Sequence, residues 1–289
     1  MTSGDSATPA TPQNPDSDKK HLVYAVFANQ TQWLLRLATG KLDEPAPDAF
    51  HVRVWRTGTL VAARTGTSGV ILASADDGPA SDYDLVLSWL TATGSGDVLI
   101  WSAAPNDAAN QALLARGAAD SFAPHWMWKS LARPVPALVP PDRIELADAT
   151  AGDLPELTAA GNRDIPYFDE QQLRIMIRLA EEDGAGAHVR IILAREVTRI
   201  RRTRIVGLVA VNTIDRDGSR TAGLFNLGVR ADARGRGIGT ALTLAALAAA
   251  QQQGATSIGL NATRDGERIY RKLGFRSIGD GQTWFMPSA

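Results

Sequence analysis

The chain has 289 residues, of which 44% are hydrophobic, and its formal net charge at pH 7 is −1. This length and apolar content suffice for two domains with buried cores, and the balanced charge argues against general nucleic-acid binding, which needs a large basic surplus. The chain has no cysteine, which excludes a disulfide, a thiolate metal site and an acyl-cysteine intermediate.

Residues 1–20 are rich in Thr, Ser, Pro, Asp and Asn, a composition that predicts a disordered tail. This tail lacks the basic start and the apolar stretch of a secretory signal. No apolar run in the sequence reaches the ~20 residues that a membrane-spanning helix needs. We therefore expect a soluble, cytoplasmic protein without a membrane partner.

Residues 21–132 combine strand-like and helical patterns and are expected to form a first domain. The segment 21–37 starts like a strand and continues like a helix. Further segments that alternate like strands are 50–55, 59–64, 69–74 and 98–101. Helical patterns occupy residues 82–93 and 106–116, and Gly117 closes the second of them.

A proline-rich segment, 133–142, divides the chain. It holds four of the fifteen prolines and favours an extended, semi-rigid spacer. We place a domain boundary there, so that residues 143–289 form a second domain. This half is expected to start with a strand, two helices and three strands. Their ranges are 143–146, 150–161, 169–182, 189–194, 205–214 and 221–229.

The most informative motif follows the last of these strands and reads Arg234-Gly-Arg-Gly-Ile-Gly239. Glycine lets backbone N–H groups approach a ligand closely, and the first N–H groups of a helix have no intrahelical partner and carry partial positive charge. From Ile238 the apolar residues recur with helical spacing, which predicts an amphipathic helix that ends at Gly254. The motif therefore predicts a pyrophosphate site at the N-terminus of a helix.

A second motif follows near the end of the chain. A short apolar strand, 257–260, precedes Asn261 and the sequence Tyr270-x-x-Leu-Gly-Phe275. Taken together, the two motifs resemble the Gcn5-related N-acetyltransferase (GNAT) family, whose signature (Arg/Gln)-x-x-Gly-x-(Gly/Ala) is matched from Arg234 to Gly239. The resemblance covers the chain from about residue 143 to the C-terminus.

The resemblance implies an α+β (α/β) fold, with a mixed, largely antiparallel twisted sheet flanked by helices, and acetyl-coenzyme A as co-substrate. In the family, the thioester lies where two parallel strands splay apart, which here are 226–229 and 257–261. A backbone N–H near Leu227 or Gly228 then stabilises the oxyanion, and Tyr270 stands where the family carries a tyrosine aimed at the departing sulfur. The residues that the resemblance assigns to the cofactor are Leu227, Gly228, Val229, Arg234, Gly235, Arg236, Gly237, Ile238, Gly239, Thr240 and Asn261.

Proton transfer and one buried amide leave alternatives open. Asn226 lies inside an apolar strand, where an amide without partners costs on the order of 1–3 kcal/mol. It either orients an acceptor or a catalytic water, or it satisfies neighbouring backbone groups.

Segment 223–229 contains no Glu, Asp or His, so the proton of the amine goes either to a water chain or to a carboxylate in the loop between the first two helices of this half. The candidates in that loop are Asp164, Asp169 and Glu170, beside Tyr167 and Phe168.

The two halves share a weak internal repeat. Segment 112–118, followed by Trp126-Met-Trp128, parallels segment 269–275, followed by Trp284-Phe-Met286. We therefore interpret residues 21–132 as a degenerate GNAT-like domain, so that the chain has two domains of one fold. The stretch 74–82, where its phosphate turn should lie, has three aspartates and no matching motif, and carboxylates repel a pyrophosphate. The first half is thus expected not to bind coenzyme A and to serve as scaffold, interface or acceptor-site wall.

Other conspicuous residues have simpler interpretations. The basic segment 195–204 lies between two strands and is predicted to be a solvated hairpin tip. The histidines lack the spacing of a zinc site, so we expect no metal, and the tryptophans before residue 130 are expected in a core or a domain interface. The histidines are His21, His51, His125 and His188, and these tryptophans are Trp33, Trp55, Trp89, Trp101, Trp126 and Trp128.

The leading hypothesis is an N-acetyltransferase that moves an acetyl group from acetyl-coenzyme A to a primary amine of a small molecule by direct attack. A protein N-terminus or lysine is the alternative acceptor, and it needs an open groove rather than a closed pocket. A third hypothesis is a regulatory module that binds an acyl-coenzyme A without turnover. We expect a monomer or a homodimer and no nucleic-acid partner.

Overall fold

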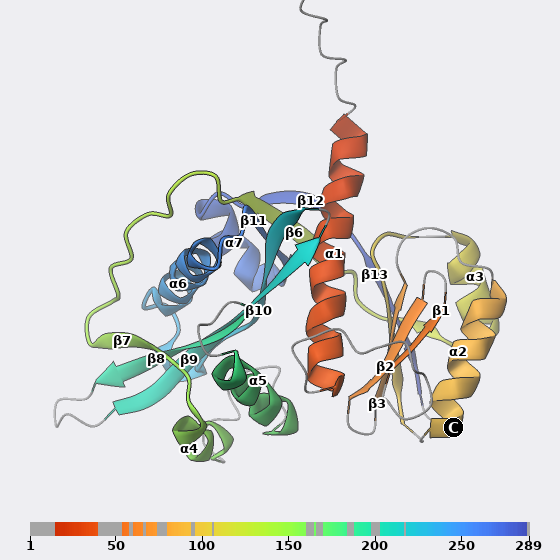
Figure 1. Ribbon diagram of the computed structural model, residues 1–289, viewed down its shortest axis with the longest axis horizontal. Coiled ribbons are helices and arrows are strands. Elements are labelled where there is room, and N and C mark those ends of the chain that lie inside the picture. The colour runs from red at the N-terminus through yellow and green to blue at the C-terminus, as the bar shows by residue number, and fades with distance from the viewer. Residues whose placement is uncertain are drawn as a thin grey trace, which may run out of the picture.

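The computed structural model consists of two β-sheets on either side of a long helix, α1 (Pro15–Thr39) (Figure 1). The structure describes residues 15–39, 54–57, 60–65, 68–73, 80–93, 96–105, 107–159, 165, 170–183, 188–197, 203–216 and 218–287. No helix among these residues combines the length and the apolar character that crossing a bilayer requires.

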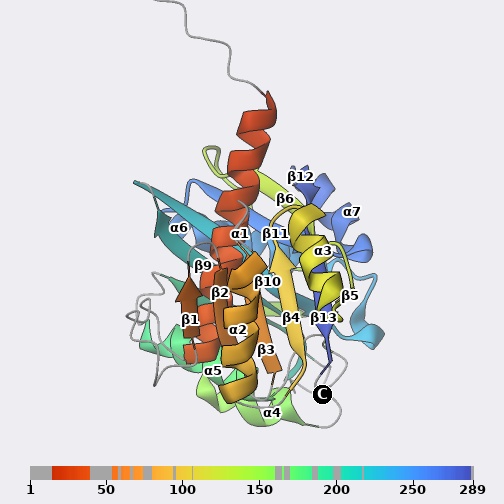
Figure 2. The ribbon, with the colours of Figure 1, turned by 90° about the vertical axis from the view of Figure 1, so that its right-hand side faces the viewer.

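The first sheet has six strands in the order β1-β2-β3-β4-β13-β5. The strands are β1 (Val54–Thr57), β2 (Leu60–Thr65), β3 (Ser68–Ala73), β4 (Val98–Ser102), β5 (Ala119–Asp120) and β13 (Gln282–Met286). Helices α2 (Ala80–Thr93) and α3 (Asp107–Ala115) cover the face that points away from α1 (Figure 2). Tyr83, Val86 and Leu90 of α2 pack there against Ile71 and Ile100 of the sheet.

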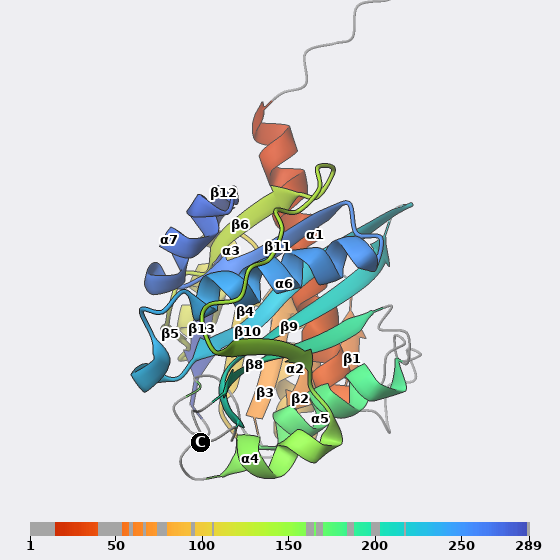
Figure 3. The same cartoon turned by 90° about the vertical axis from the view of Figure 1, so that its left-hand side faces the viewer.

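The second sheet has seven strands in the order β12-β6-β11-β10-β9-β8-β7. The strands are β6 (His125–Ser130), β7 (Ile144–Asp148), β8 (Val189–Val197), β9 (Thr203–Arg216), β10 (Ser219–Val229), β11 (Ser257–Ala262) and β12 (Arg276–Asp280). Helices α6 (Ile238–Gln252) and α7 (Arg264–Lys272) lie on one face (Figure 3), and α5 (Glu170–Glu182) lies on the other. Each face of this sheet has its own hydrophobic core, and alternate residues of β9 point into one or the other. Val209 and Val211 face α6, whereas Leu208 and Ala210 face α5.

The predicted elements of the second half are largely confirmed. The expected helix at 150–161 is shorter, however, and consists of a 3-10 turn, η1 (Ala151–Asp153), followed by α4 (Leu154–Thr158). Pro155 stands in the first turn of α4, where its missing N–H is tolerated. The proline-rich connector crosses the outer face of α6 (Figure 3), where the Gln251 side chain donates to the carbonyls of Leu131 and Arg133 at 2.8 Å.

Each half of the chain donates one strand to the sheet of the other. Strand β6 precedes the proline-rich connector, yet it pairs with β11 and β12 of the second sheet. Strand β13 ends the chain, yet it pairs with β4 and β5 of the first sheet. The ranges 21–132 and 143–289 therefore do not coincide with the two sheets. Sequence patterns could not predict this exchange, because they indicate where strands occur and not which strands pair.

The two exchanged strands cross at a tightly bonded point. The N–H of Gly281 donates to the carbonyl of Pro124 at 2.8 Å, and the N–H of Ser121 donates to the carbonyl of Thr283 at 3.0 Å. A Cβ on Gly281 would lie 2.8 Å from the indole nitrogen of Trp126, so the crossing has no room for a side chain. Trp126 itself is fully buried and packs edge-to-face against Phe27 of α1.

The internal repeat is confirmed by matching helix ends. In the first half, the N–H of Ala118 donates to the carbonyl of Leu113 at 3.1 Å, and in the second half the N–H of Phe275 donates to the carbonyl of Tyr270 at 3.0 Å. Gly117 and the corresponding Gly274 have φ angles of 83° and 84°, the left-handed conformation that ends a helix at glycine. Each helix end then leads into a strand that is followed by the exchanged strand.

Helix α1 differs most from the sequence prediction. The segment 21–37 does not start as a strand, and residues 15–20, inside the predicted disordered tail, already belong to the helix. The start of this segment was predicted as a strand because its apolar residues show no one-sided helical pattern. A helix that is buried on several sides lacks that pattern. Residues 1–14 lie outside the described part of the chain.

Two glycines on neighbouring strands let α1 approach the second sheet. A Cβ on Gly259 of β11 would lie 2.2 Å from Val26, and one on Gly223 of β10 would lie 2.6 Å from the Oδ1 atom of Asn29. Helix α1 therefore lies directly on the strands that carry the sequence motifs.

A buried polar chain fixes α1 over β9 and β10. The Nδ2 of Asn29 donates to the carbonyl of Thr221 at 3.1 Å, and the Nδ2 of Asn212 donates to the Oδ1 of Asn29 at 2.8 Å. Arg36 donates to the Oδ1 of Asn212 and to the carbonyl of Thr213. Because buried polar groups must be satisfied to avoid a large penalty, this chain specifies the position of the helix on the sheet.

Candidate active site

Strands β10 and β11 separate in the stretch where the family resemblance places the thioester. They pair in parallel only from Thr221–Gly223 to Ser257–Gly259, although both strands continue further. The edge of residues 224–229 that faces β11 therefore has no ladder partner on that strand. In the first sheet, by contrast, the equivalent parallel strands β3 and β4 stay paired from Gly69 to Ala73, the last residue of β3.

A bulge in β10 lies at the start of this unpaired stretch. The register against β9 shifts between Phe225 and Gly228, and Asn226 has a φ angle of 55°. Asparagine tolerates this left-handed conformation better than most residues, which gives a backbone reason for Asn226 in an otherwise apolar strand. Phe225, immediately before the bulge, stacks on Trp33 of α1 with ring centroids 5.2 Å apart.

The predicted phosphate turn lies at the N-terminus of α6, directly after β10. Gly235 and Gly237 have φ angles of 75° and 81°, a conformation that favours glycine. The first backbone bond into the helix runs from the N–H of Ala241 to the carbonyl of Gly237 at 3.0 Å, and within the described part of the chain the amides of residues 235–240 donate to no backbone carbonyl. These N–H groups, at the positive end of the helix dipole, fit a diphosphate.

The side chains around this turn have different surroundings. The Nε of Arg234 donates to the carbonyl of Val229 at 3.1 Å and so closes the turn. Ile238 is buried in the core, so only its backbone can contribute to binding. Gly239 packs closely, since a Cβ there would lie 3.1 Å from Ile269. Thr240 stands in the first turn of α6, and Leu227, Gly228 and Val229 form the end of β10 that leads into the turn.

Two carboxylates that sequence reasoning missed, Glu196 and Asp232, form ion pairs around the turn, and Glu196 pairs with its Arg236. The Oε1 of Glu196 lies 2.7 Å from the Nη1 of Arg236, and its Oε2 accepts from Arg204 at 2.8 Å. Arg204 also donates to Asp232, just before the turn, at 2.8 Å. Hydrogen bonds from Arg236 and Arg204 hold the pKa of the Glu196 carboxyl below its ordinary value. Arg236 is therefore held beside the turn by Glu196.

Where it is described, the basic segment 195–204 forms the adjoining ends of β8 and β9. Arg195 pairs with Asp153, and Arg204 pairs with Glu196 and Asp232. The tip, residues 198–202, lies outside the described residues.

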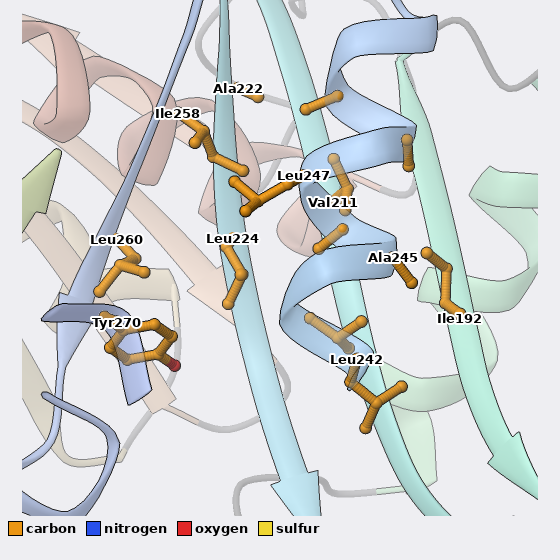
Figure 4. Close-up of a cluster of buried hydrophobic side chains, with 14 of the residues drawn as sticks. Ile192, Val211, Ala222, Leu224, Leu242, Ala245, Leu247, Ile258, Leu260 and Tyr270 are labelled. Carbon is orange, nitrogen blue, oxygen red and sulfur yellow. The ribbon is translucent and has the colours of Figure 1, made fainter. Parts of the chain in front are cut away.

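Tyr270 of α7 stands at the side of the unpaired stretch. Its ring is buried and packs edge-to-face against Phe275, with ring centroids 5.6 Å apart. A Cβ at Gly266 would lie 2.9 Å from the ring, so a larger residue would clash there. Figure 4 shows the ring below Leu260 of β11, with its hydroxyl oxygen directed toward the side of β10. Burial raises the pKa of this phenol above its ordinary value, so the hydroxyl stays protonated and can donate a hydrogen bond.

Asn261, predicted to contact the cofactor, has a structural partner. Its Oδ1 accepts from the backbone N–H of His125 at 3.0 Å and thereby ties β11 to the exchanged strand β6. The oxygen of this amide is thus committed to the sheet. The sequence could not indicate this bond, because His125 lies in the other half of the chain.

Of the candidate general bases, the structure describes only Glu170. Glu170 is exposed and accepts from the Nε of Arg174, one helical turn later, at 3.0 Å, which is the behaviour of an ordinary helix-surface ion pair. Asp164, Tyr167, Phe168 and Asp169 lie outside the described residues. The transfer of the amine proton to a water chain or to a carboxylate of this loop stays a prediction.

The described residues of the first half differ from the second half at the corresponding positions. Strands β3 and β4 stay paired as far as they are described, and Leu113 stands at the helix position of Tyr270. Residues 74–79, where the equivalent of the phosphate turn is expected, lie outside the described residues. Leucine has no acidic proton, so this half has no counterpart of the acid at that position.

Comparison with known proteins gives one family match. The family model described as "Acetyltransferase (GNAT) domain" matches residues 188–277, which include β8 to α7 and thus the splay, the turn and Tyr270. No curated protein sequence matches the chain.

Several solved structures share the fold over nearly the whole chain. A Gcn5-related N-acetyltransferase from Kribbella flavida has a TM-score of 0.60 and 17% identity, covering 93% of this chain and 96% of its own. A tandem GNAT protein from the clavulanic acid biosynthesis pathway has a TM-score of 0.54 and 16% identity, covering 92% and 97%. A Gcn5-related glucosamine N-acetyltransferase region of a fungal multi-domain β-N-acetylglucosaminidase has a TM-score of 0.55 and 15% identity, covering 98% of this chain and 39% of its own. Two mixed, twisted sheets flanked by helices are common to the chain and these neighbours, and residues 188–277 match the model of the GNAT acetyltransferase domain.

Proposed function

We propose that the protein transfers an acetyl group from acetyl-coenzyme A to a primary amine of a small molecule. The observation that carries this proposal is the unpaired stretch of β10, which has the free amides of residues 235–240 at one end and Tyr270 beside it. The amides and Arg234 fit the diphosphate, and coenzyme A would supply the activated acetyl thioester.

The residues of the splay suit direct transfer without a covalent protein intermediate. A backbone N–H of the bulge, at Leu227 or Gly228, would donate to the thioester carbonyl oxygen as negative charge develops. The neutral amine attacks the carbonyl carbon, the carbon–sulfur bond breaks, and the Tyr270 hydroxyl protonates the departing sulfur. The amine loses its own proton to water or to a carboxylate of the loop between α4 and α5.

A small acceptor is supported by how the sheet is covered. Helix α1 lies directly on Gly223 and Gly259, at the last paired residues, while α6 and α7 cover the opposite face. With both faces covered in this way, an acceptor would approach from the strand ends. This arrangement disfavours an extended peptide, which pairs along an open edge.

The direct test is incubation of the full-length protein with acetyl-coenzyme A and a panel of amines, with free thiol as the readout. The panel should contain polyamines, amino sugars including glucosamine, amino acids and a lysine peptide. Thiol release with a small amine is expected. Release with the peptide alone would favour the protein-acetylating alternative, and tight cofactor binding with no release would favour the regulatory module.

Tyr270→Phe should lower kcat roughly a hundredfold, because it removes one proton donor while it keeps the ring against Phe275. The affinity for acetyl-coenzyme A should stay nearly unchanged, and calorimetry on the variant measures it. If kcat and affinity fall together, Tyr270 holds the helix and does not protonate sulfur.

Cofactor binding should saturate at one coenzyme A per chain. The second half has the unpaired stretch of β10 and the free amides of residues 235–240, whereas β3 and β4 of the first half stay paired over their described residues. Calorimetric titration gives the stoichiometry. Two sites per chain would contradict the interpretation of the first half as a degenerate copy.

A further inference from the structure

We propose that His125, which the first half contributes on strand β6, is a positioning residue for Tyr270 of the second half. The inference rests on the proposed function, in which Tyr270 is the acid. No role for a histidine follows from the motifs of the sequence, and His125 enters the site only through the strand exchange.

His125 joins two strands of the catalytic sheet. It is the first residue of β6 and stands opposite Ala262 on β11 and Asp280 on β12. Its backbone N–H donates to the Oδ1 of Asn261 at 3.0 Å, and its Nδ1 lies 2.6 Å from the Oδ1 of Asp280. Backbone and side chain together fix the orientation of the imidazole ring.

The second ring nitrogen faces helix α7. The Nε2 of His125 is buried, has no hydrogen-bond partner among the described residues and lies 3.7 Å from the Oε1 of Glu267. Glu267 precedes Tyr270 by one helical turn, and Arg271 holds the same oxygen at 2.6 Å from the other side. The charged groups around the ring are thus Asp280 on β12 with Glu267 and Arg271 on α7.

Helix α7 is short and depends on such anchors. It has nine residues, of which Tyr270 is the buried one. A helix of this length is marginal without tertiary contacts. Because residues three apart share a helix face, a contact at Glu267 acts on the turn that carries Tyr270. His125 therefore bonds to β11 through its backbone N–H and to β12 through its imidazole Nδ1, and its Nε2 lies 3.7 Å from Glu267 on α7.

The corresponding position in the first sheet lacks the imidazole. Strand β13 starts with Gln282 opposite Ser102, the last residue of β4, just as β6 starts with His125 opposite the last residue of β11. Gln282 reaches Asp120 through its amide at 3.4 Å, and Leu113 replaces the tyrosine in that half. The histidine thus occurs in the sheet that lies beside Tyr270, and glutamine occurs in the sheet whose corresponding helix position is Leu113.

The experiment compares full-length wild type with His125→Gln, which keeps a polar side chain but loses the ring. Hydrogen–deuterium exchange should become several-fold faster in residues 264–272 and stay unchanged in α6. In the amine assay kcat should fall by roughly ten- to a hundredfold, as expected when a reacting group is misplaced, while KM for acetyl-coenzyme A is unchanged. In a Tyr270→Phe background the same substitution should lower kcat no further.

His188→Gln is the matched control. His188 also pairs its Nδ1 with an aspartate, Asp183, at 2.9 Å, but it precedes β8 and is bonded to neither β11 nor α7. This variant should leave α7 exchange and kcat unchanged.

Two outcomes would overturn the proposal. One is hydrogen–deuterium exchange in α7 of His125→Gln that equals wild type. The other is a double variant, His125→Gln with Tyr270→Phe, whose loss of kcat is the product of the two single losses. If wild type acetylates no amine while α7 exchange rises in His125→Gln, the proposed function fails, and the anchoring of α7 by His125 is still supported.

Discussion

A chain that starts at Arg143 should fail to fold, although it contains the complete GNAT motif. It lacks β6, so β11 and β12 lose the strand between them, and it lacks α1, so Gly223 and Gly259 lose the helix that covers them. The buried indole of Trp126 is lost with β6, and loss of one buried aromatic side chain alone costs about 3–5 kcal/mol. Typical domains are stable by only about 5–15 kcal/mol. Circular dichroism and sedimentation of the fragment should show an unfolded or aggregated chain.

The control for this truncation is a cut that removes no residue. Opening the chain within 133–142 and producing both parts together should give a complex that co-purifies, because each part holds a strand of the other part's sheet. A monodisperse, cooperatively melting fragment 143–289 would contradict the prediction.

Gly237→Asp should reduce the affinity for acetyl-coenzyme A by at least about a hundredfold. Two unit charges of the same sign 4 Å apart repel by about 4 kcal/mol at an effective dielectric constant of 20, and 1.4 kcal/mol corresponds to a factor of ten. The substitution causes no clash, since a Cβ at Gly237 would meet only Pro141 at 3.6 Å, but the left-handed φ of 81° strains any side chain there. Isothermal titration calorimetry measures the affinity.

Two controls separate charge from backbone strain. Gly237→Asn has nearly the same shape without the charge and tolerates the left-handed φ of 81°, so it should weaken binding far less. Gly218→Asp places the same residue at a φ of 73° in the β9–β10 turn, where it should change melting slightly and affinity not at all. Equal losses for Asp and Asn at position 237 would show that strain, not anion repulsion, is responsible.

Local signals in the sequence predicted much of the second half. The turn at Gly235 and Gly237 and the helix start at Ile238 follow from neighbouring residues alone, because glycine conformation and helical spacing are short-range properties. The position of Tyr270 beside the splay also followed, since the resemblance joined two motifs separated by a helix and a strand. The matching helix ends at Gly117 and Gly274 made the repeat visible.

What the sequence could not predict depends on contacts between distant residues. The pairing of β6 with β11 joins residues more than a hundred positions apart, and the side chain of Asn261 was assigned to the cofactor although it bonds to His125. Glu196 was missed for the same reason, because its position gives no hint that it will reach Arg236. Helix α1 was misread because its burial between two sheets erased the one-sided pattern by which helices are detected.

The exchange of strands also determines which substitutions the first half can accumulate. Its unsplit pair of strands and the leucine at the helix end need not preserve any chemistry, so changes there are neutral while the sheet keeps its shape. Strand β6 is different, because its Met127 is buried in the core of the reactive half and its Trp126 in the core beside α1. A non-reactive copy that is woven into its active neighbour in this way can lose its own activity during evolution, but it cannot be deleted.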